Sequence, residues 1–150
     1  MTVADVDEVM AVELQAYPFP WSRGHFTDSL AAGYLAQLRL AGRELIGYYV
    51  AMPGVDEIHL LNLTVAPAHQ SRGHARALLA HLAQEAQSLQ AAQIWLEVRE
   101  SNTRARVLYE RWGFETAGLR KSYYPAACGQ REHALVMRWA VPPAGEGWLE

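Results

Sequence analysis

Apolar side chains that recur three and four positions apart predict the helices of this chain. The clearest pattern covers residues 75–89, about four turns of an amphipathic helix. Shorter helices are predicted over residues 5–16, from residue 22 to about residue 32, and over residues 102–112. Each of these three follows a residue type that favours a helix N-terminus, namely Asp5, Ser22 and Asn102.

Strands are predicted where β-branched, aromatic and aliphatic residues cluster between turn residues. Residues 34–40 and 45–52 read as a hairpin around the turn Ala41-Gly42-Arg43-Glu44. The run 57–65 is apolar on both faces, which predicts a central strand buried on two sides. Three later strands are expected at residues 93–99, 114–121 and 133–140, and a helix between two strands indicates a parallel pair. The longest irregular segment is expected between Tyr123 and Arg131.

Length and composition indicate one globular domain. A chain of 150 residues with 51% hydrophobic and 19% charged residues is typical of a folded protein. We expect a single domain over residues 1–141 and a proline-containing tail over residues 142–150. Apolar runs stay well short of the roughly 20 residues that span a bilayer, so no membrane association is expected.

The compartment is predicted from the first residues and from cysteine usage. Residues 1–8 lack the basic region and apolar core of a secretory signal, so we expect a cytoplasmic protein. Cys128 is the only cysteine and is interpreted as an incidental loop thiol rather than a nucleophile. The net charge of −3 argues against direct nucleic-acid binding and makes a basic peptide the better partner.

The turn between Val65 and the helix at residues 75–89 has the composition of an anion site. Residues 70–76 read Gln-Ser-Arg-Gly-His-Ala-Arg, and the first amides of a helix favour negative charge. The turn lacks the spaced glycines of a dinucleotide site and the Gly-Lys-Ser/Thr ending of a nucleotide P-loop. A different phosphate carrier is therefore expected.

This order of elements resembles the GCN5-related N-acetyltransferase superfamily over most of the chain. Gln70, Gly73 and Ala75 occupy the three defined places of that family's acetyl-CoA motif, and Asn102 and Tyr109 follow at the family's spacing. The resemblance implies a mixed α+β fold, with a mostly antiparallel sheet of about six to seven strands and about four flanking helices. It also implies a parallel, splayed strand pair at the cofactor site.

Acetyl-CoA is the cosubstrate that this resemblance implies. It assigns the cofactor to one set of residues: Leu63, Thr64, Val65, Ser71, Arg72, Gly73, His74, Ala75, Arg76 and Asn102. Each group also has an alternative role without a cofactor. Arg72 and Arg76 could be solvated residues at a helix end, and the side chains of residues 63–65 could belong to the core. Asn102 could simply cap a helix.

Further segments resemble the bacterial enzymes that acetylate the N-terminal alanine of a small-subunit ribosomal protein. They are Phe19-Pro20-Trp21-Ser22, Trp95-Leu96-Glu97-Val98-Arg99, Ser101-Asn102 and Tyr123-Tyr124-Pro125. Two positions depart from that pattern: His74 stands where aliphatic residues are common, and His133 where aspartate is frequent. This resemblance implies that the partner is the N-terminus of a basic ribosomal protein. A monomer is expected separately.

Two residues are expected to carry the chemistry. By resemblance Glu97 accepts the proton of the acceptor ammonium, and Tyr109 protonates the departing thiolate. The alternatives are a solvated Glu97 or one paired with Arg99 or Arg104, and a core tyrosine at position 109. The transfer is expected to be direct, within a ternary complex.

Aromatic residues next to prolines are the candidates for binding the peptide. Tyr17, Phe19, Trp21, Tyr123 and Tyr124 are predicted to line the groove, with core packing as the competing view. The histidines lack the cysteine or carboxylate neighbours of a zinc site, so no metal is expected. Two other functions stay open, namely acetylation of a lysine or small amine, and a non-catalytic acyl-CoA-binding module.

Overall fold

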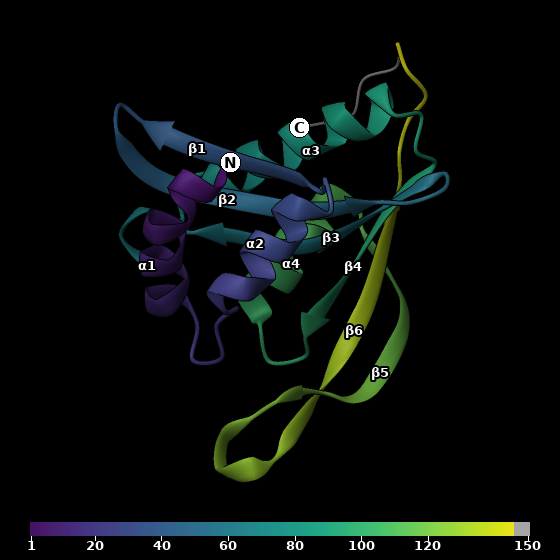
Figure 1. Ribbon diagram of the computed structural model, residues 1–150. Helices are drawn as coiled ribbons and strands as arrows, with labels where there is room; N and C mark the ends of the chain where they lie inside the picture. The colour runs from purple at the N-terminus through teal and green to yellow at the C-terminus, as the bar shows by residue number, and fades with distance from the viewer. Residues whose placement is uncertain (146–150) are drawn as a thin grey trace. The chain divides into compact units, whose positions relative to one another are not determined.

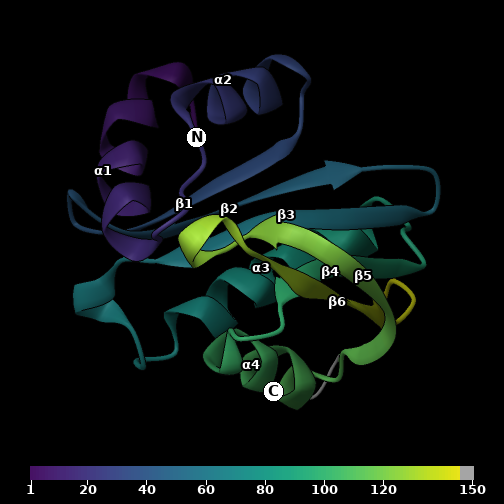
Figure 2. The same ribbon diagram turned by 90° about the horizontal axis from the view of Figure 1, so that it is seen from below.

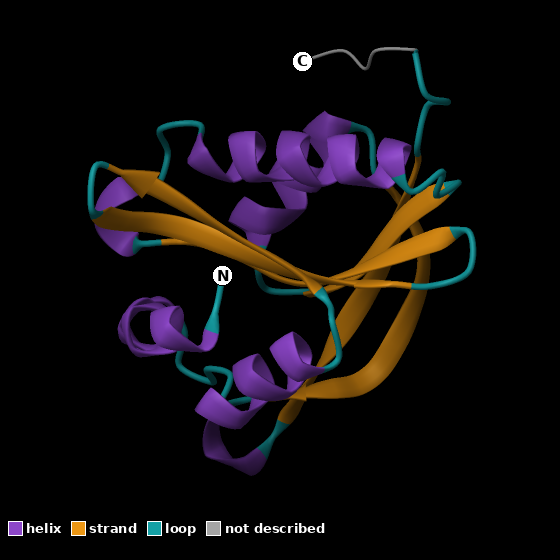
Figure 3. Ribbon diagram, turned by 45° about the horizontal axis from the view of Figure 1, so that its top comes forward, coloured by secondary structure: helices purple, strands orange, loops and turns teal. Residues whose placement is uncertain are grey.

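The computed structural model describes residues 1–145 of the chain. Its helices are α1 (Val6–Ala16), α2 (Arg23–Ala31), α3 (His74–Ser88) and α4 (Thr103–Trp112). Its strands are β1 (Leu35–Ala41), β2 (Glu44–Pro53), β3 (Glu57–Val65), β4 (Gln93–Arg99), β5 (Glu115–Pro125) and β6 (Arg131–Ala140). Figure 1 labels these elements and Figure 3 colours them by type. Residues 146–150 of the predicted tail lie outside the described residues.

The strands form one mixed sheet in the order β1-β2-β3-β4-β6-β5. The pairs β1/β2, β4/β6 and β5/β6 are antiparallel, whereas β3 and β4 are parallel. The expected α+β class, the antiparallel hairpin at the start of the sheet and the parallel pair are thereby confirmed. None of the helices within residues 1–145 is long and apolar enough to cross a membrane.

By its internal contacts the chain divides into two compact units. The first consists of Met1–Pro53 and Leu60–Leu82, and the second of Gly54–His59 and the chain from Ala83 onward. Strand β3 and helix α3 therefore contribute residues to both units. Each unit has its own core.

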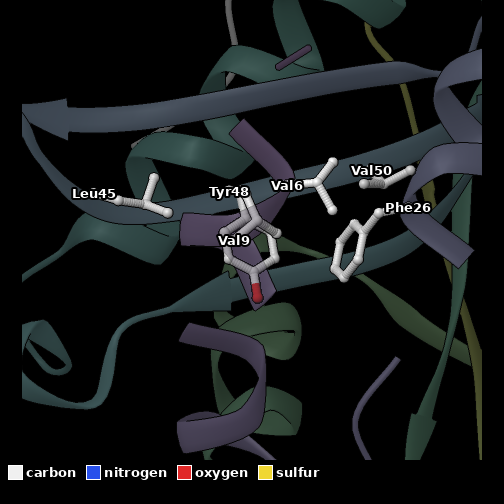
Figure 4. Close-up of a cluster of buried hydrophobic side chains, with 6 residues drawn as sticks. All are labelled: Val6, Val9, Phe26, Leu45, Tyr48 and Val50. Carbon is white, nitrogen blue, oxygen red and sulfur yellow. The ribbon is translucent and has the colours of Figure 1, made fainter. Parts of the chain in front are cut away.

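In the first unit, α1 and α2 lie on the same side of the β1/β2 hairpin (Figure 2). Their apolar faces meet the hairpin in a cluster of buried side chains drawn in Figure 4: Val6, Val9, Phe26, Leu45, Tyr48 and Val50. Phe26 meets the ring of Tyr48 edge-on, with 5.8 Å between ring centroids. The periodic apolar positions of the N-terminal helices are thus explained by packing on one sheet face.

Strands β2 and β3 approach each other unusually closely at Gly47. A Cβ atom at this position would lie 2.5 Å from the carbonyl oxygen of Thr64 and 3.2 Å from the Cα atom of Val65. A real Cβ is excluded at that distance, so only glycine allows β3 to follow this path. The residue type at position 47 therefore fixes the course of the strand on which Thr64 and Val65 lie.

The core of the second unit lies between α4 and the strands β4 and β6. Ile94 and Met137 are fully buried, and Trp112 at the end of α4 meets Trp139 of β6 edge-on at 5.5 Å. Helix α4 ends at Gly113, which has a φ angle of 121°. Glycine adopts such a positive φ angle with little strain, because it lacks a Cβ atom. In the register of β4 and β6, Glu97 stands opposite Val136.

Two local expectations are wrong. Strand β5 runs on to Pro125, so Tyr123 and Tyr124 are strand residues, and the irregular segment before β6 is shorter than predicted. The pairing of β5 with β6 is interrupted by irregularities at residues 116–118 and 120–124. Because of these irregularities, the residues of the strand do not alternate regularly between its two faces. The second difference is at Asp5, whose carboxylate accepts from the Thr2 amide at 2.7 Å instead of capping α1.

Candidate active site

The predicted phosphate turn has a conformation suited to an anion. Ser71 and Gly73 have positive φ angles of 64° and 84°, and α3 begins at His74 immediately after them. Upstream, the Gln70 side chain donates to the carbonyl of Val65 at 3.1 Å and ties the turn to the end of β3. Because helix N-termini present amides that lack acceptors inside the helix, this turn directs donors toward a bound anion.

Charged side chains surround the start of α3. The Arg39 Nε donates to Nδ1 of His74 at 3.0 Å, and His69 pairs with the Glu44 carboxylate at 2.7 Å. Partial burial, followed by the nearby Arg39, His69 and Arg72, lowers the pKa of His74 below its ordinary value of 6.5. His74 is therefore neutral at pH 7, and arginine supplies the positive charge of the turn.

The predicted cofactor strand is anchored by a buried polar network. Thr64 donates its hydroxyl to Asn62 Oδ1 at 2.6 Å and contacts the Tyr17 hydroxyl at 2.8 Å. The Tyr17 hydroxyl also donates to the carbonyl of Leu63 at 3.3 Å. Burial raises the pKa of Tyr17 to about 12, against the lowering effect of the Thr64 hydrogen bond and with a further increase from Glu13, so its hydroxyl stays protonated.

Glu13 is the centre of this network. Its side chain is 1% exposed, and its carboxylate accepts from Tyr48 at 2.6 Å, from Asn62 at 3.2 Å and from the Trp21 amide at 2.9 Å. Burial and the neighbouring Glu13 raise the pKa of Tyr48, so this phenol is a permanent donor. A buried carboxylate is tolerated because each of its oxygens accepts hydrogen bonds. Glu13 thus connects the aromatic loop after α1 with β3.

The three aromatic residues of that loop have different environments. Tyr17 turns into the buried network, and Trp21 packs on Phe26 at 5.0 Å between ring centroids. Phe19, in contrast, is 42% exposed. The core-packing view thus describes Trp21 and Tyr17 well, whereas Phe19 is partly exposed.

Glu97 is held by two basic partners in the second unit. Its side chain is 6% exposed, its Oε2 is hydrogen-bonded to Nε2 of His59, and its Oε1 lies 3.2 Å from Nε of Arg120. The His59 ring stacks on Trp95 with 4.0 Å between centroids and 7° between planes. The buried Glu97 carboxylate thus has partners in His59 and Arg120, neither of which sequence reasoning had proposed.

Arg99, one of the two arginines named in the alternative view of Glu97, lies against groups at the end of β5 and on β6. Arg99 pairs with Glu132 at 3.0 Å and also donates to the carbonyl of Pro125 at 2.7 Å. Burial raises the pKa of Glu132, but hydrogen bonds from Arg99 and Ser101 outweigh it and hold that pKa below its ordinary value. The Arg99 side chain therefore supports the end of β5.

The predicted tyrosines of β5 lie among these arginines. Tyr123 and Tyr124 meet at 4.9 Å between ring centroids, with Arg99 4.5 Å from the ring centre of Tyr124 and Arg120 5.2 Å from that of Tyr123. Burial, then the negative charge of Glu97, raises the pKa of Tyr124. Since Arg120 contacts both Glu97 and Tyr123, it joins a predicted catalytic residue to a predicted substrate residue within one unit.

Two further predicted residues are the N-cap of α4 and a residue within that helix. Asn102 accepts a hydrogen bond from the Ala105 amide at 3.2 Å and so caps the helix as its sequence position indicates. Tyr109 is 7% exposed and meets Phe114 edge-on at 5.5 Å. Within the described residues, His, Cys, Asp and Glu side chains form no group of three that could hold a metal ion.

Sequence reasoning missed four residues that shape these sites: Glu13, His59, Asn62 and Arg120. Glu13 and Asn62 occupy buried positions, where a polar side chain among apolar neighbours is the available signal. His59 and Arg120 meet Glu97 from 38 residues before it and 23 residues after it. Such contacts depend on the order of the strands in the sheet, and local sequence patterns do not determine that order.

Comparisons with known proteins agree with this architecture. Residues 6–114 match the acetyltransferase (GNAT) family. The [ribosomal protein bS18]-alanine N-acetyltransferase of Haemophilus ducreyi is 37% identical over 133 residues, which cover 89% of this chain and 92% of that protein. The crystal structure of the ribosomal-protein-S18-alanine N-acetyltransferase from Escherichia coli superimposes with a TM-score of 0.89 at 35% identity, over 100% of this chain and 96% of that one.

A third comparison extends the fold to more distant proteins. A Bacillus subtilis acetyltransferase crystallised with CoA superimposes with a TM-score of 0.75 at 20% identity, over 91% of this chain and 93% of that one. A similarity at this level supports the fold alone. The two relatives above 30% identity and the family match, in contrast, cover most of the sequence. This chain belongs to the acetyltransferase (GNAT) family.

Proposed function

We propose that this protein transfers the acetyl group of acetyl-CoA to the N-terminal alanine of a small-subunit ribosomal protein equivalent to bS18. The observation that carries the proposal is the similarity to bS18-alanine N-acetyltransferases along nearly the full length of both chains, with 37% identity to the Haemophilus ducreyi enzyme. An acceptor with an α-amine also fits the chemistry, because an α-ammonium loses its proton about two to three pH units below a lysine side chain.

The donor is assigned to the turn before α3 and to the end of β3. Backbone amides of Ser71 to Arg76 would hold the pyrophosphate, with Arg72 and Arg76 adding charge. The backbone of Leu63, Thr64 and Val65 would bind the pantetheine arm, and Asn102 would contribute a hydrogen bond. Ser71 and Gly73 have positive φ angles, as expected for a tight turn before a helix. The space beside Gly73 is open, because a Cβ added there would meet no atom within 4 Å. These residues fit an anionic donor.

Glu97 and Tyr109 are proposed to move the protons. The acceptor ammonium loses a proton to the Glu97 site, the neutral amine forms a bond to the acetyl carbon, and the carbon–sulfur bond breaks. Tyr109 then donates its hydroxyl proton to the departing thiolate, whose ordinary pKa of about 8.5 makes a nearby donor useful at neutral pH. The nitrogen, now bonded to the acetyl carbon, loses its second proton to the Tyr109 phenolate, which restores the hydroxyl. The transfer is direct, so no acyl-enzyme forms.

The peptide acceptor is assigned to the exposed aromatic residues. Phe19 and Tyr123 are each 42% exposed, and both belong to the predicted groove. Within their own units, Tyr17 and Trp21 are proposed to support the loop that carries Phe19, and Tyr124 to support Tyr123. Rigid aromatic side chains provide contact area at a small cost in conformational entropy.

A peptide assay separates this function from its alternatives. The enzyme is incubated with acetyl-CoA and a peptide that begins with alanine and contains one lysine, and the acetylated position is read by mass spectrometry. Modification of the α-amine supports the proposal. Modification of the lysine in a peptide whose N-terminus is blocked would assign the protein to lysine acetylation, and CoA binding without turnover would make it an acyl-CoA-binding module.

The remaining proposals concern the state of the protein in the cell. We propose a cytoplasmic monomer in which residues 1–141 act as one domain, without direct binding to nucleic acid or membrane. The single cysteine, Cys128, is exposed and fits a reducing compartment, and the net charge of −3 fits a basic protein partner. Size-exclusion chromatography with light scattering and a single unfolding transition test the monomer and the single domain.

A further inference from the structure

We propose that His59 and Glu97 act as one unit, in which the imidazole takes the proton of the acceptor amine at Nδ1 and Glu97 holds the opposite ring nitrogen. This inference rests on the proposed function and identifies the atom of the site that receives the proton. It differs from the simpler view in which the Glu97 carboxylate is the sole base.

The two side chains come from the neighbouring strands β3 and β4 and lie in the same unit. Nε2 of His59 is hydrogen-bonded to Oε2 of Glu97, and the imidazole stacks flat on the indole of Trp95. The stack and the hydrogen bond together fix both the position and the rotation of the ring. His59 is the more accessible of the pair, with 14% of its side chain exposed against 6% for Glu97.

The hydrogen bond determines which ring nitrogen is basic. An ionised carboxylate only accepts hydrogen bonds, so with Glu97 ionised the proton of the neutral imidazole lies on Nε2. The lone pair of the ring is then on Nδ1. When Nδ1 takes a proton, the positive imidazolium faces the negative carboxylate, so Glu97 stabilises the product of the transfer.

An imidazole also matches the acceptor better than a carboxylate does. An α-ammonium has an ordinary pKa of about 7.7 to 8.0, against about 6.5 for imidazole side chains and about 4.3 for glutamate side chains. Proton transfer to a free carboxylate is therefore unfavourable by roughly 3000-fold, and transfer to an imidazole by only about 20-fold. The pair lowers this barrier while Glu97 keeps the ring oriented.

Other charged and titratable groups lie around the pair. Strand β4 contributes Arg99, β5 contributes Arg120, Tyr123 and Tyr124, and β6 contributes Glu132, while Glu57 stands at the start of β3. Arg120 lies 3.2 Å from Oε1 of Glu97 and compensates part of its charge. Arg120 also lies 5.2 Å from the ring centre of Tyr123, so it is shared between the pair and the predicted peptide site.

The proton balance of the step is complete. One N–H bond of the ammonium breaks and the Nδ1–H bond of His59 forms. The neutral amine then forms the amide bond as the thioester bond breaks, and the thiolate takes the hydroxyl proton of Tyr109. The nitrogen, which is positively charged once it is bonded to the acetyl carbon, then loses its second proton to the Tyr109 phenolate and restores the hydroxyl, while His59 releases its proton to water.

The pH dependence of peptide acetylation tests the inference. The rate constants kcat and kcat/KM are measured with an alanine-starting peptide for the unchanged protein, His59→Gln and Glu97→Gln, from about pH 6 to 9.5. We expect His59→Gln to lower kcat about 100-fold near pH 7, with a deficit that shrinks as the amine deprotonates above about pH 8. The KM for acetyl-CoA should stay within about twofold.

Two further measurements separate a proton-accepting role from a structural one. Added imidazole should restore part of the activity of His59→Ala, because a free base can occupy the vacated space. The matched control is His81→Gln, which removes a histidine that contacts the Tyr49 hydroxyl at 2.8 Å, and it should keep the activity and pH profile of the unchanged protein.

The outcomes distinguish the inference from the function on which it rests. If the unchanged protein leaves the α-amine unmodified, both the proposed function and the inference are wrong. If the unchanged protein acetylates the peptide but His59→Gln has the same rate, or the same fractional deficit at every pH, the inference alone is overturned.

Discussion

The Tyr48 hydroxyl donates to the Glu13 carboxylate at 2.6 Å, between two residues that are 35 positions apart and fully buried. Glu13 lies on α1 and Tyr48 on β2, so this hydrogen bond joins a helix to the sheet on which it packs. The same carboxylate accepts the Trp21 amide. The first unit therefore contains a charged group at its centre that stabilises helix, sheet and aromatic loop together.

Glu13→Ala should destabilise the protein strongly. The substitution leaves Tyr48, Asn62 and the Trp21 amide without the acceptor that they share, and stranded buried donors cost about 1–3 kcal/mol each before relaxation. We expect the free energy of unfolding to fall by about 2–4 kcal/mol, measured by urea denaturation. Glu8→Ala, an exposed position on the same helix, should change it by less than about 0.5 kcal/mol. Equal effects of the two substitutions would contradict the structural role of Glu13.

Tyr109→Phe should separate catalysis from binding. Tyr109 is largely buried and packs edge-on against Phe114, a contact that phenylalanine preserves. If its hydroxyl protonates the thiolate, kcat should fall roughly 10² to 10⁴-fold while the affinity for acetyl-CoA stays nearly unchanged. Turnover and calorimetric titration with acetyl-CoA check this. An unchanged turnover rate would make Tyr109 a core residue only.

Gly47→Ala should impair the predicted cofactor strand. The new methyl group would lie 2.5 Å from the Thr64 carbonyl oxygen, so β2 and β3 must separate locally. We expect a loss of about 1–3 kcal/mol in the free energy of unfolding and a weaker affinity for acetyl-CoA. Gly24→Ala is the matched control, because a Cβ there meets only the Ser22 hydroxyl oxygen at 3.6 Å. Equal acetyl-CoA affinities for both variants would separate Gly47 from the cofactor site.

Glu132 should contribute to the acid sensitivity of the fold. Its pKa lies below the ordinary value of 4.5 because hydrogen bonds from Arg99 and Ser101 outweigh its burial. A depressed pKa in the folded state means that the stabilisation is present above the unfolded-state pKa and is lost as the pH falls through the folded-state value. In Glu132→Gln the decline in stability between about pH 5 and pH 3 should therefore be shallower than in the unchanged protein, as measured by urea unfolding.

Phe19→Ala and Tyr123→Ala should act on the peptide rather than on the donor. Both side chains are 42% exposed, so their truncation removes contact area without opening a buried cavity. We expect each to raise the KM for the peptide by about tenfold, with the KM for acetyl-CoA unchanged. Leu89→Ala, at an exposed position after α3, is the control and should affect neither constant. A rise in the KM for acetyl-CoA would assign the aromatic residues to the donor.

Most of the fold was predictable because its signals are local. Helix α3 follows from the apolar spacing after Gly73, and α2 and α4 begin after Ser22 and Asn102, which both cap through their side chains. The end of β5 was not predictable, because its irregular pairing and its exposed face lack a period-two apolar pattern. Local propensity describes an element well when one of its faces is buried.

The candidate site was predictable in its residue types but not in its partners. A carboxylate within the apolar strand around Glu97 indicated either a partner or a cleft, and Arg99 and Arg104 were the partners named in the alternative view. The actual partners, His59 and Arg120, reach Glu97 through the order of strands in the sheet. Arg99 is instead drawn to Glu132 on β6. Partner choice is thus decided by topology, which a single sequence specifies only weakly.

Strand β5 is the last strand of the sheet, and its free edge bears on the solubility of the protein. An open strand edge is a template for pairing with another copy of the chain, and natural proteins interrupt such edges with charges, bulges and proline. Strand β5 carries Arg120 and Lys121, two pairing irregularities and a proline at its end, Pro125. The features that hid this strand from sequence analysis are therefore the same ones that discourage aggregation through its edge.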